Sequence, residues 1–351
     1  MGAEWIGEQL RGAGLLDRGA VTGLEWEPIG TGQVGDSVRF HLSYDRPGAG
    51  PATLAGKFPA ADPTSRQTAA AFGLYAKEVG FYRDLASKLA VRTPRALIAA
   101  IAGNGVDFAL LFEDLGPARG GDQLAGCTLV DARLGIAQMA ALHAPSWENR
   151  EMLGLPWLQA APGTAEQITA LYGPAQALFR ERYRDTLEPE LMRVCDELAE
   201  AGDLWFGRGA LPRSLQHGDF RLDNLLFEVR GGAEPIAVLD WQTLAAGNGL
   251  TDLGYFLGCG IGDDLRRAHE DELIGLYLME MAARGVALTR EEMRDGYRLG
   301  ALHGVSTAVF SAAYVERTPR GDANFLSMAR GACALALAHD SLGLLKGATA
   351  C

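Results

Sequence analysis

The chain has 351 residues, of which 48% are hydrophobic and 22% are charged, and its formal net charge at pH 7 is −12. This length permits two domains or lobes with a substantial core. The negative charge argues against nucleic acid or an anionic membrane as the main partner.

The composition contains no signal of a membrane or secreted protein. The longest nearly apolar run, residues 96–102, is too short to span a bilayer. The first ten residues contain Glu4 and no apolar signal segment. The five cysteines are scattered and form no CxxC pair, which is typical of a reduced intracellular protein. We therefore expect a cytoplasmic protein without membrane insertion, and the sequence leaves its oligomeric state open.

The first third of the chain is predicted to be rich in β-structure. After a helical lead-in over residues 1–25, alternating side chains and turn residues predict strands. We expect these strands at residues 38–44, 51–58, 96–101 and 107–112. Apolar residues at helical spacing, from Phe72 to Leu89, predict one main helix over residues 66–90.

The rest of the chain is predicted to be mostly helical. Helical periodicity indicates helices at residues 128–143, 165–186, 188–203, 264–284, 290–315 and 325–345. Short strands are expected within 214–228 and 236–241. The loop-forming segment FEDLGPARGG (112–121) lies where the pattern changes. We expect an N-terminal lobe over 1–115, a hinge at about 111–116 and a helical C-terminal lobe over 116–351.

The strongest motif is HGDFRLDN, residues 217–224, with the spacing H-x-D-x-x-x-x-N. Phosphoryl transfer to an alcohol requires a carboxylate that orients the hydroxyl and oxygen ligands that hold Mg²⁺ on the phosphates. Asp219 suits the first task and the Asn224 side-chain oxygen the second. Asp240 adds an oxygen donor at the end of a predicted strand. An isolated HxD pair also occurs as a turn cap, but the apolar runs that flank this loop favour catalysis.

The motif HGDFRLDN, followed by LDWQ (239–242) and GLTDLGYFLG (249–258), resembles the aminoglycoside phosphotransferase/choline kinase-like family. It is most similar to the subgroup of ecdysteroid-kinase-like proteins and uncharacterised bacterial phosphotransferases. The resemblance implies an α+β, bilobal, protein-kinase-like fold with a small β-rich N-lobe and a larger helical C-lobe.

The resemblance also implies roles for the residues of the catalytic loop and its supports. Asp219 becomes the catalytic base, and Asn224 and Asp240 become ligands of Mg²⁺. His217 braces the loop, and Asp252 hydrogen-bonds the backbone of that loop. Arg221 either stabilises charge in the transition state or is an ordinary surface cation.

Two charged residues of the N-terminal lobe complete the expected set. Lys57, in LAGK, resembles the strand lysine of protein kinases that contacts the α- and β-phosphates of ATP. Ala55 shares its strand face and leaves room for adenine. Glu78, on the predicted helix, is expected to pair with Lys57 because it lies beside the apolar stripe, where an unpaired carboxylate is costly. The alternative is a peripheral glutamate.

Backbone groups are expected to bind the rest of the nucleotide. Gly30, Gly32 and Gly35 lie in a turn between two predicted strands, where glycine lets N–H groups approach phosphate. The same residues also suit an ordinary hairpin. By resemblance, the Glu113 carbonyl and the Leu115 amide bind adenine. These are backbone contacts, so the residue types at these positions say little about whether the contacts form.

The sequence thus predicts an ATP- and Mg²⁺-dependent kinase of a small-molecule alcohol. Clustered carboxylates near Asp219 would indicate an aminoglycoside or a choline-like cation, whereas an apolar pocket would indicate a sterol, a lipid alcohol or a hydroxyacyl thioester. One alternative is a nucleotide-binding pseudokinase that acts through partners. Another is a metal-dependent hydrolase that uses His217, Asp219 and Asp240, although such a site needs more histidine ligands nearby.

Overall fold

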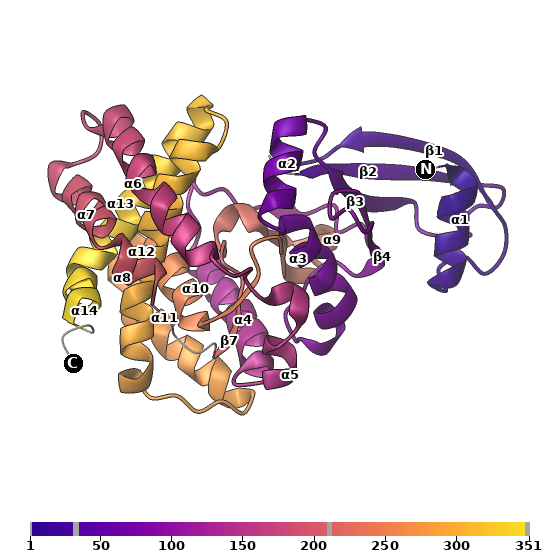
Figure 1. Cartoon of the computed structure of the whole chain (residues 1–351). Coiled ribbons are helices and arrows are strands. Elements are labelled where there is room, and N and C mark those ends of the chain that lie inside the picture. Colours follow the sequence, from indigo (N-terminus) through magenta and orange to yellow (C-terminus); the bar gives the residue numbers. More distant parts are fainter. Residues whose placement is uncertain (1, 31–34, 209–212, 348–351) are drawn as a thin grey trace. The chain divides into compact units, whose positions relative to one another are not determined.

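The computed structural model describes residues 2–30, 35–208 and 213–347 (Figure 1). The described part of the chain divides into two compact units. Unit 1 consists of three segments, Met1–Lys88, Arg92–Ala118 and Glu228–Thr243, and unit 2 consists of Leu89–Val91, Arg119–Phe227 and Leu244–Cys351. Unit 1 is β-rich and unit 2 is helical, so the α+β prediction is confirmed.

Within the described residues, unit 1 contains a five-stranded antiparallel sheet with the strand order β1-β2-β3-β5-β4. The strands are β1 (Val21–Pro28), β2 (Gly35–Tyr44), β3 (Thr53–Pro59), β4 (Ala96–Ile101) and β5 (Phe108–Glu113). The register places Lys57 opposite Ser37 on β2 and opposite Leu110 on β5. Lys57 and Ala55 therefore lie on the same face of the sheet, as predicted.

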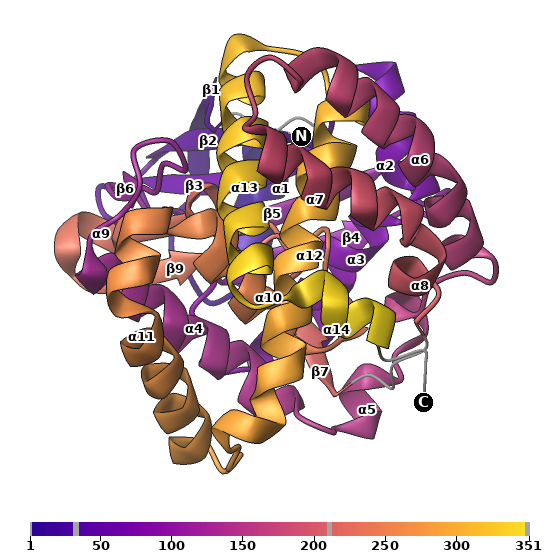
Figure 2. The same cartoon turned by 90° about the vertical axis from the view of Figure 1, so that its left-hand side faces the viewer.

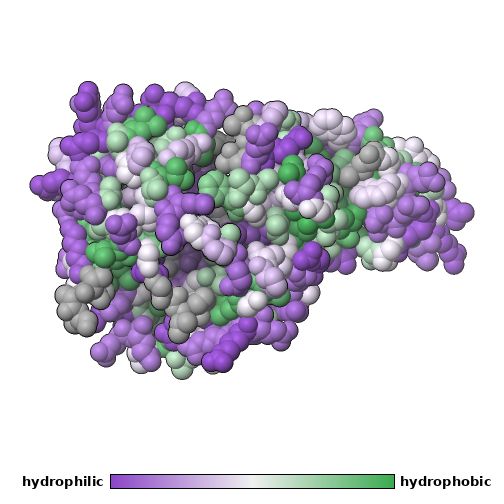
Figure 3. Space-filling model, viewed as in Figure 1, coloured by the Kyte–Doolittle hydropathy of each residue, from purple (hydrophilic) through white to green (hydrophobic). Residues whose placement is uncertain are grey.

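The N-terminal helix α1 (Ala3–Gly12) packs on this sheet at the end where β1 begins (Figure 1). Ile6 and Leu10 are fully buried against side chains of the sheet that include Phe40 and Leu54. The polar side of α1 faces solvent, and Figure 3 shows hydrophilic residues gathered over this helix. The helix ends well before residue 25, because a strand begins at Val21, so the longer helical lead-in was wrong.

The main helix predicted over residues 66–90 is broken into shorter pieces. These are α2 (Pro63–Ala71), α3 (Leu74–Gly80), a π-helix (Phe81–Leu85) and a 3₁₀-helix (Ala86–Lys88). Gly73 has φ +65°, a left-handed conformation that favours glycine and ends the first helix. Because of this break, Phe72 is half exposed instead of joining the buried stripe.

Residues 228–243 belong to unit 1, although the predicted division placed them in the C-terminal lobe. They contain the short turn α9 (Val229–Gly232) and the strand β9 (Glu234–Val238). Trp241 explains this grouping, since its ring stacks on Phe81 with centroids 3.8 Å apart. Its Nε1 donates to Thr93 Oγ1 at 2.9 Å. A lobe boundary near residues 111–116 stays a prediction.

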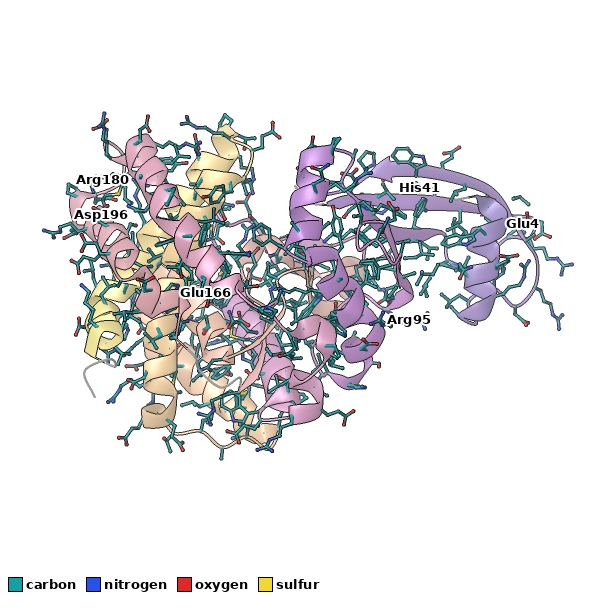
Figure 4. The ribbon with its side chains drawn as sticks, viewed as in Figure 1. Glu4, His41, Arg95, Glu166, Arg180 and Asp196 are labelled. Carbon is teal, nitrogen blue, oxygen red and sulfur yellow. The ribbon has the colours of Figure 1, made fainter. Side chains whose placement is uncertain are left out.

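Unit 2 is built mainly from helices. In the described residues these are α4 (Leu129–Ser146), α5 (Arg150–Leu153), α6 (Thr164–Tyr183), α7 (Pro189–Glu200), α8 (Gly202–Phe206), α10 (Gly249–Tyr255), α11 (Asp263–Ala283), α12 (Arg290–Tyr314), α13 (Pro319–Ala338) and α14 (Ser341–Gly347). Figure 2 shows α12 and α13 running side by side. At the surface, Arg180 of α6 pairs with Asp196 of α7 (Figure 4).

No described helix has both the length and the apolar character that a membrane crossing requires.

Helix ends in unit 2 follow local capping. Thr128 and Thr289 form capping boxes with Asp131 and Glu292 at the starts of α4 and α12. The predicted helix over residues 325–345 is two helices, because the chain adopts a left-handed conformation at Asp340, with φ +48°. Short strands complete the unit: β6 (Arg119–Gly120) pairs with β8 (Leu225–Glu228), and β7 (Ser214–Gln216) pairs with β10 (Ala245–Gly247).

Candidate active site

In unit 1, the largely buried side chain of Lys57 joins two carboxylates from distant parts of the chain. Lys57 Nζ lies 2.8 Å from Glu78 Oε2 and 3.2 Å from Asp240 Oδ1. The three side chains are 14%, 2% and 27% exposed, respectively. Burial alone would lower the pKa of Lys57, but the charges of Asp240 and Glu78 outweigh it and the pKa is raised. The pair predicted between Lys57 and Glu78 therefore forms, and Asp240 joins it.

Asp240 is held in place by its neighbours along the chain. It has φ +62°, a left-handed conformation that a non-glycine residue adopts only where the surroundings hold it. Trp241 is anchored beneath it by the stack on Phe81. Gln242 Nε2 donates to Asp240 Oδ2 at 3.2 Å. Each carboxylate oxygen of Asp240 thus has one polar neighbour, and the side chain keeps access to solvent.

The glycine turn lies partly outside the described residues. Gly32 falls in that gap, whereas Gly30 and Gly35 border it. Gly30 has φ +75°, which favours glycine. A Cβ at Gly35 would lie 3.2 Å from Lys57 Cε, so glycine at this position lets β2 pass close to the lysine.

A hollow of about 600 Å³ also lies on unit 1. Its apolar walls include Trp26, Phe40 and Phe58, which the strand register assigns to the sheet face opposite Lys57. Gly30, Gly35 and Ser37 also line the hollow, so its rim reaches the glycine turn and the neighbourhood of Lys57.

The predicted hinge has a feature that the sequence did not indicate. Glu113 is the last residue of β5, and its N–H donates to the Arg95 carbonyl at 3.1 Å. Its carboxylate pairs with Arg92 at 2.7 Å and also with Arg230. The Leu115 carbonyl accepts from the Arg230 N–H at 3.1 Å. The side chain of Glu113 thus has two ion-pair partners of its own, which the expectation of backbone contacts to adenine did not address.

In unit 2, the predicted catalytic loop, residues 217–224, lies between β7 and β8, and donors surround the Asp219 carboxylate. Tyr255 OH donates to Asp219 Oδ1 at 2.7 Å, and Asn224 Nδ2 donates to Oδ2 at 2.9 Å. Arg221 Nε lies 3.0 Å from Oδ1. Burial alone would raise the pKa of Asp219, but the charge of Arg221 and the Tyr255 hydrogen bond outweigh it, and the pKa is lowered. Asp219 is therefore ionised at neutral pH.

Arg221 is a bridge between carboxylates of the loop. Its guanidinium pairs with Asp219 and, through Nη1, with Asp223. Burial would lower its pKa, but the charge of Asp219 outweighs this and the pKa is raised. Arg221 is thus no isolated surface cation, since its side chain is largely buried in this network.

The orientation of Asn224 suits a cation ligand. It ends a 3₁₀ turn, Leu222–Asn224, and its Nδ2 donates both to the backbone carbonyl and to the carboxylate of Asp219. Because Nδ2 faces Asp219, Oδ1 points away from it and is the atom offered to a metal. Amide and carboxylate oxygens are the donors that Mg²⁺ prefers, so Asn224 and Asp240 fit this ion.

Buried polar residues brace the loop from behind. Asp252 accepts from the His217 N–H at 2.6 Å and from the Gly218 N–H at 2.9 Å, which confirms the predicted role of Asp252. His143 Nε2 donates to the same carboxylate at 3.1 Å. His303 Nε2 donates to the Gly218 carbonyl at 2.8 Å. The main chain of the loop is therefore fixed on both its N–H and its C=O groups.

Sequence reasoning missed Tyr255 as a hydrogen-bond partner of Asp219. The available signal was its position three residues after Asp252 in TDLGYF, which places both on one face of α10.

The structure brings Lys57, Glu78 and Asp240 together in unit 1, and Asp219, Arg221 and Asn224 together in unit 2. Among the described residues, no group of three or more His, Cys, Asp or Glu side chains is placed to hold a metal.

Comparison with known proteins identifies the family of the chain and other proteins that share its fold. The sequence profile of the ecdysteroid kinase-like family matches residues 37–290, most of the chain. A curated relative, acyl-CoA dehydrogenase family member 11 of Gallus gallus, is 32% identical over 126 residues. The match covers 35% of the chain but only 14% of that longer protein.

Solved structures share the fold at low sequence identity. Aminoglycoside 2'-phosphotransferase-IIIa in complex with GDP has a TM-score of 0.54 and 16% identity, over 89% of this chain and 94% of the other. A candidate aminoglycoside phosphotransferase from Ralstonia eutropha has a TM-score of 0.52 and 16% identity, with 95% and 98% covered. Plasmodium vivax ethanolamine kinase has a TM-score of 0.51 and 11% identity, with 87% and 80% covered. The fold implied by the sequence motifs is thereby confirmed.

Proposed function

The chain belongs to the ecdysteroid kinase-like family, and on this premise we propose that it is an ATP- and Mg²⁺-dependent phosphotransferase. It moves the γ-phosphate of ATP to a hydroxyl group of a small molecule. The single observation that carries this proposal is the environment of Asp219. Its carboxylate is ionised, partly exposed and held by donors from Tyr255, Arg221 and Asn224.

Asp219 orients the acceptor hydroxyl and takes its proton as the hydroxyl oxygen bonds to phosphorus and the bond to ADP breaks. A carboxylate with a lowered pKa is a weak base. It accepts the proton only late in the reaction, which suits the loose transition state of phosphoryl transfer. Arg221, beside Asp219, is the cation nearest to this proton transfer and stabilises charge there.

Lys57 binds the phosphates, and Glu78 holds its ammonium group in position. Gly30, Gly32 and Gly35 let the backbone approach the phosphates, and the Glu113 carbonyl and Leu115 amide bind the base. Asn224 and Asp240 hold Mg²⁺ through side-chain oxygens. When bound, this ion neutralises charge on the phosphates.

The acceptor is proposed to be an alcohol, and two classes are favoured by different observations. The fold is shared with aminoglycoside phosphotransferases and an ethanolamine kinase, which act on amino alcohols according to their names. The curated relative is named as an acyl-CoA dehydrogenase family member. That name favours the second class, a hydroxyacyl thioester.

The test is acceptor-dependent release of ADP from MgATP. Candidate acceptors are aminoglycosides, amino alcohols, sterols and hydroxyacyl-CoA thioesters, each compared with the Asp219→Asn variant. We expect one class to stimulate ADP release in the wild type and not in the variant. MgATP binding without turnover on any acceptor would instead favour the pseudokinase alternative.

A further inference from the structure

Four side chains of unit 1 form a closed ring of alternating charge, here called the charge ring. Glu113 pairs with Arg92 at 2.7 Å, and Arg92 Nη2 lies 3.0 Å from Glu234 Oε1. Glu234 pairs with Arg230 at 3.2 Å, and Arg230 closes the ring on Glu113. Each charge thus has two opposite neighbours. Such a network holds its geometry better than an isolated surface pair.

Arg230 adds backbone contacts to the charge ring. Its N–H donates to the Leu115 carbonyl at 3.1 Å, and the N–H of Gly231 donates to the Pro117 carbonyl at 2.8 Å. At the other end of the segment, the Glu113 carboxylate accepts from the Arg95 N–H at 2.8 Å, and Arg95 is labelled in Figure 4. Segment 113–117 is therefore held through both its main chain and the Glu113 side chain.

The conformation of Arg230 indicates that this contact is specific. Arg230 has φ +55° and ψ 44°, a left-handed conformation that is unfavourable for a residue with a Cβ. Glu228 on the same turn also has positive φ, at +53°. Strained residues of this kind persist where surrounding contacts hold them, and they cluster at ligand-binding segments. Here the contacts are the charge ring and the two hydrogen bonds to segment 113–117.

We propose that Arg230 is a positioning residue for the nucleotide base and sets the preference between adenine and guanine. The inference rests on the proposed function, which assigns base binding to the main chain of Glu113 and Leu115. Main-chain N–H and C=O groups hydrogen-bond to one edge of the base, and on that edge adenine and guanine present opposite patterns of donors and acceptors. A segment held in one conformation discriminates between them, whereas a segment free to shift accommodates both.

The experiment measures dissociation constants of MgATP and MgGTP by calorimetry, which needs no acceptor. Arg230→Met keeps an unbranched apolar stem and removes the guanidinium group with its charge. Arg230→Lys restores the charge without the planar guanidinium that pairs with two carboxylates. The matched control is Arg133→Met, because Arg133 pairs with Glu272 in unit 2 and is 49% exposed, against 44% for Arg230. A fourth variant, Glu234→Gln, weakens the charge ring at Glu234 and serves if Arg230→Met does not fold.

For Arg230→Met we expect weaker binding of the preferred nucleotide by about tenfold and a ratio of the two dissociation constants that moves toward one. Arg230→Lys recovers part of both effects, Glu234→Gln shows a smaller change in the same direction, and Arg133→Met leaves the ratio unchanged. An unchanged ratio in Arg230→Met, with a wild type that binds nucleotide, would overturn this inference alone. A wild type that binds neither nucleotide would overturn it together with the proposed function.

Discussion

The two clusters of the candidate site hold a carboxylate in different ways. In unit 1, Glu78 is almost fully buried, which raises its pKa, and its partner Lys57, 21 residues away in sequence, opposes that effect. In unit 2, Asp219 is balanced by Arg221 and Asn224 from its own loop and by the Tyr255 hydroxyl. The first cluster depends on ion pairing between distant segments, and the second depends on hydrogen bonds that are mostly local. Removing a partner should therefore harm stability most in unit 1 and catalysis most in unit 2.

The largest effect is expected for Asp219→Asn. Loss of the proton acceptor should lower kcat by about a thousandfold and leave MgATP affinity nearly unchanged, because this side chain acts on the acceptor. The matched control is Asp223→Asn, since Asp223 is a second carboxylate on the same loop and also pairs with Arg221. A loss of kcat in the control as large as that in Asp219→Asn would remove the special role of Asp219.

The next largest effect is expected for Lys57→Met. This change leaves Glu78 and Asp240 facing each other without a cation, and it should lower the free energy of unfolding by about 3 kcal/mol. Added MgATP should no longer raise the melting temperature. The double variant Lys57→Met with Glu78→Gln should be more stable than Lys57→Met, because a buried unpaired charge is removed. A double variant that is less stable would contradict the ion-pair account of unit 1.

A smaller effect is expected for Tyr255→Phe, which removes the hydroxyl that bonds Asp219 and keeps the ring. A hydrogen bond to a charged group of this kind should change kcat by about tenfold. Tyr277→Phe is the control, because Tyr277 is equally buried and its hydroxyl bonds His143 at 3.0 Å. Both variants should lose similar stability, and only Tyr255→Phe should lose kcat. Equal kcat values for the two would show that Tyr255 is purely structural.

The smallest effect concerns pH and His303 in unit 2. Burial lowers the pKa of His303 below its ordinary value of 6.5, more than its hydrogen bond to Gly218 raises it. The unfolded chain therefore binds a proton below pH 6.5 that the folded protein does not bind. Stability should thus fall with decreasing pH in this window by at most about 1.4 kcal/mol per pH unit. Urea unfolding between pH 7 and pH 5 should show a smaller slope for His303→Asn, and an identical slope would contradict this.

Local chemistry was predictable from the sequence, and long-range geometry was not. The catalytic loop and the strand with Lys57 were found, because their residues are close in sequence and carry a recognisable spacing. The pair between Lys57 and Glu78 was predicted from the place of Glu78 beside the apolar stripe of its helix, together with the resemblance. The helix that carries Glu78 was predicted too long, since helical periodicity does not register the left-handed conformation of Gly73.

Other features of the site depend on contacts that no local pattern encodes. The charge ring unites residues 92, 113, 230 and 234, and their spacing follows no helix or strand period. Residues 228–243 belong to unit 1 through several long-range contacts, which include the stack of Trp241 on Phe81 and the pair of Arg230 with Glu113. Likewise, the hydrogen bond of Tyr255 to Asp219 joins two elements 36 residues apart.

The proposed function requires that Asn224 and Asp240 bind the same Mg²⁺ ion, and a double-mutant cycle tests this requirement most directly. Asn224→Ala and Asp240→Ala, singly and combined, are compared by the Mg²⁺ concentration that half-saturates ATP binding. If both side chains hold the same ion, each single change raises this concentration, and the effect of the combined change differs from the product of the two single effects. Strictly multiplicative effects, or a variant with an unchanged Mg²⁺ requirement, would contradict the account.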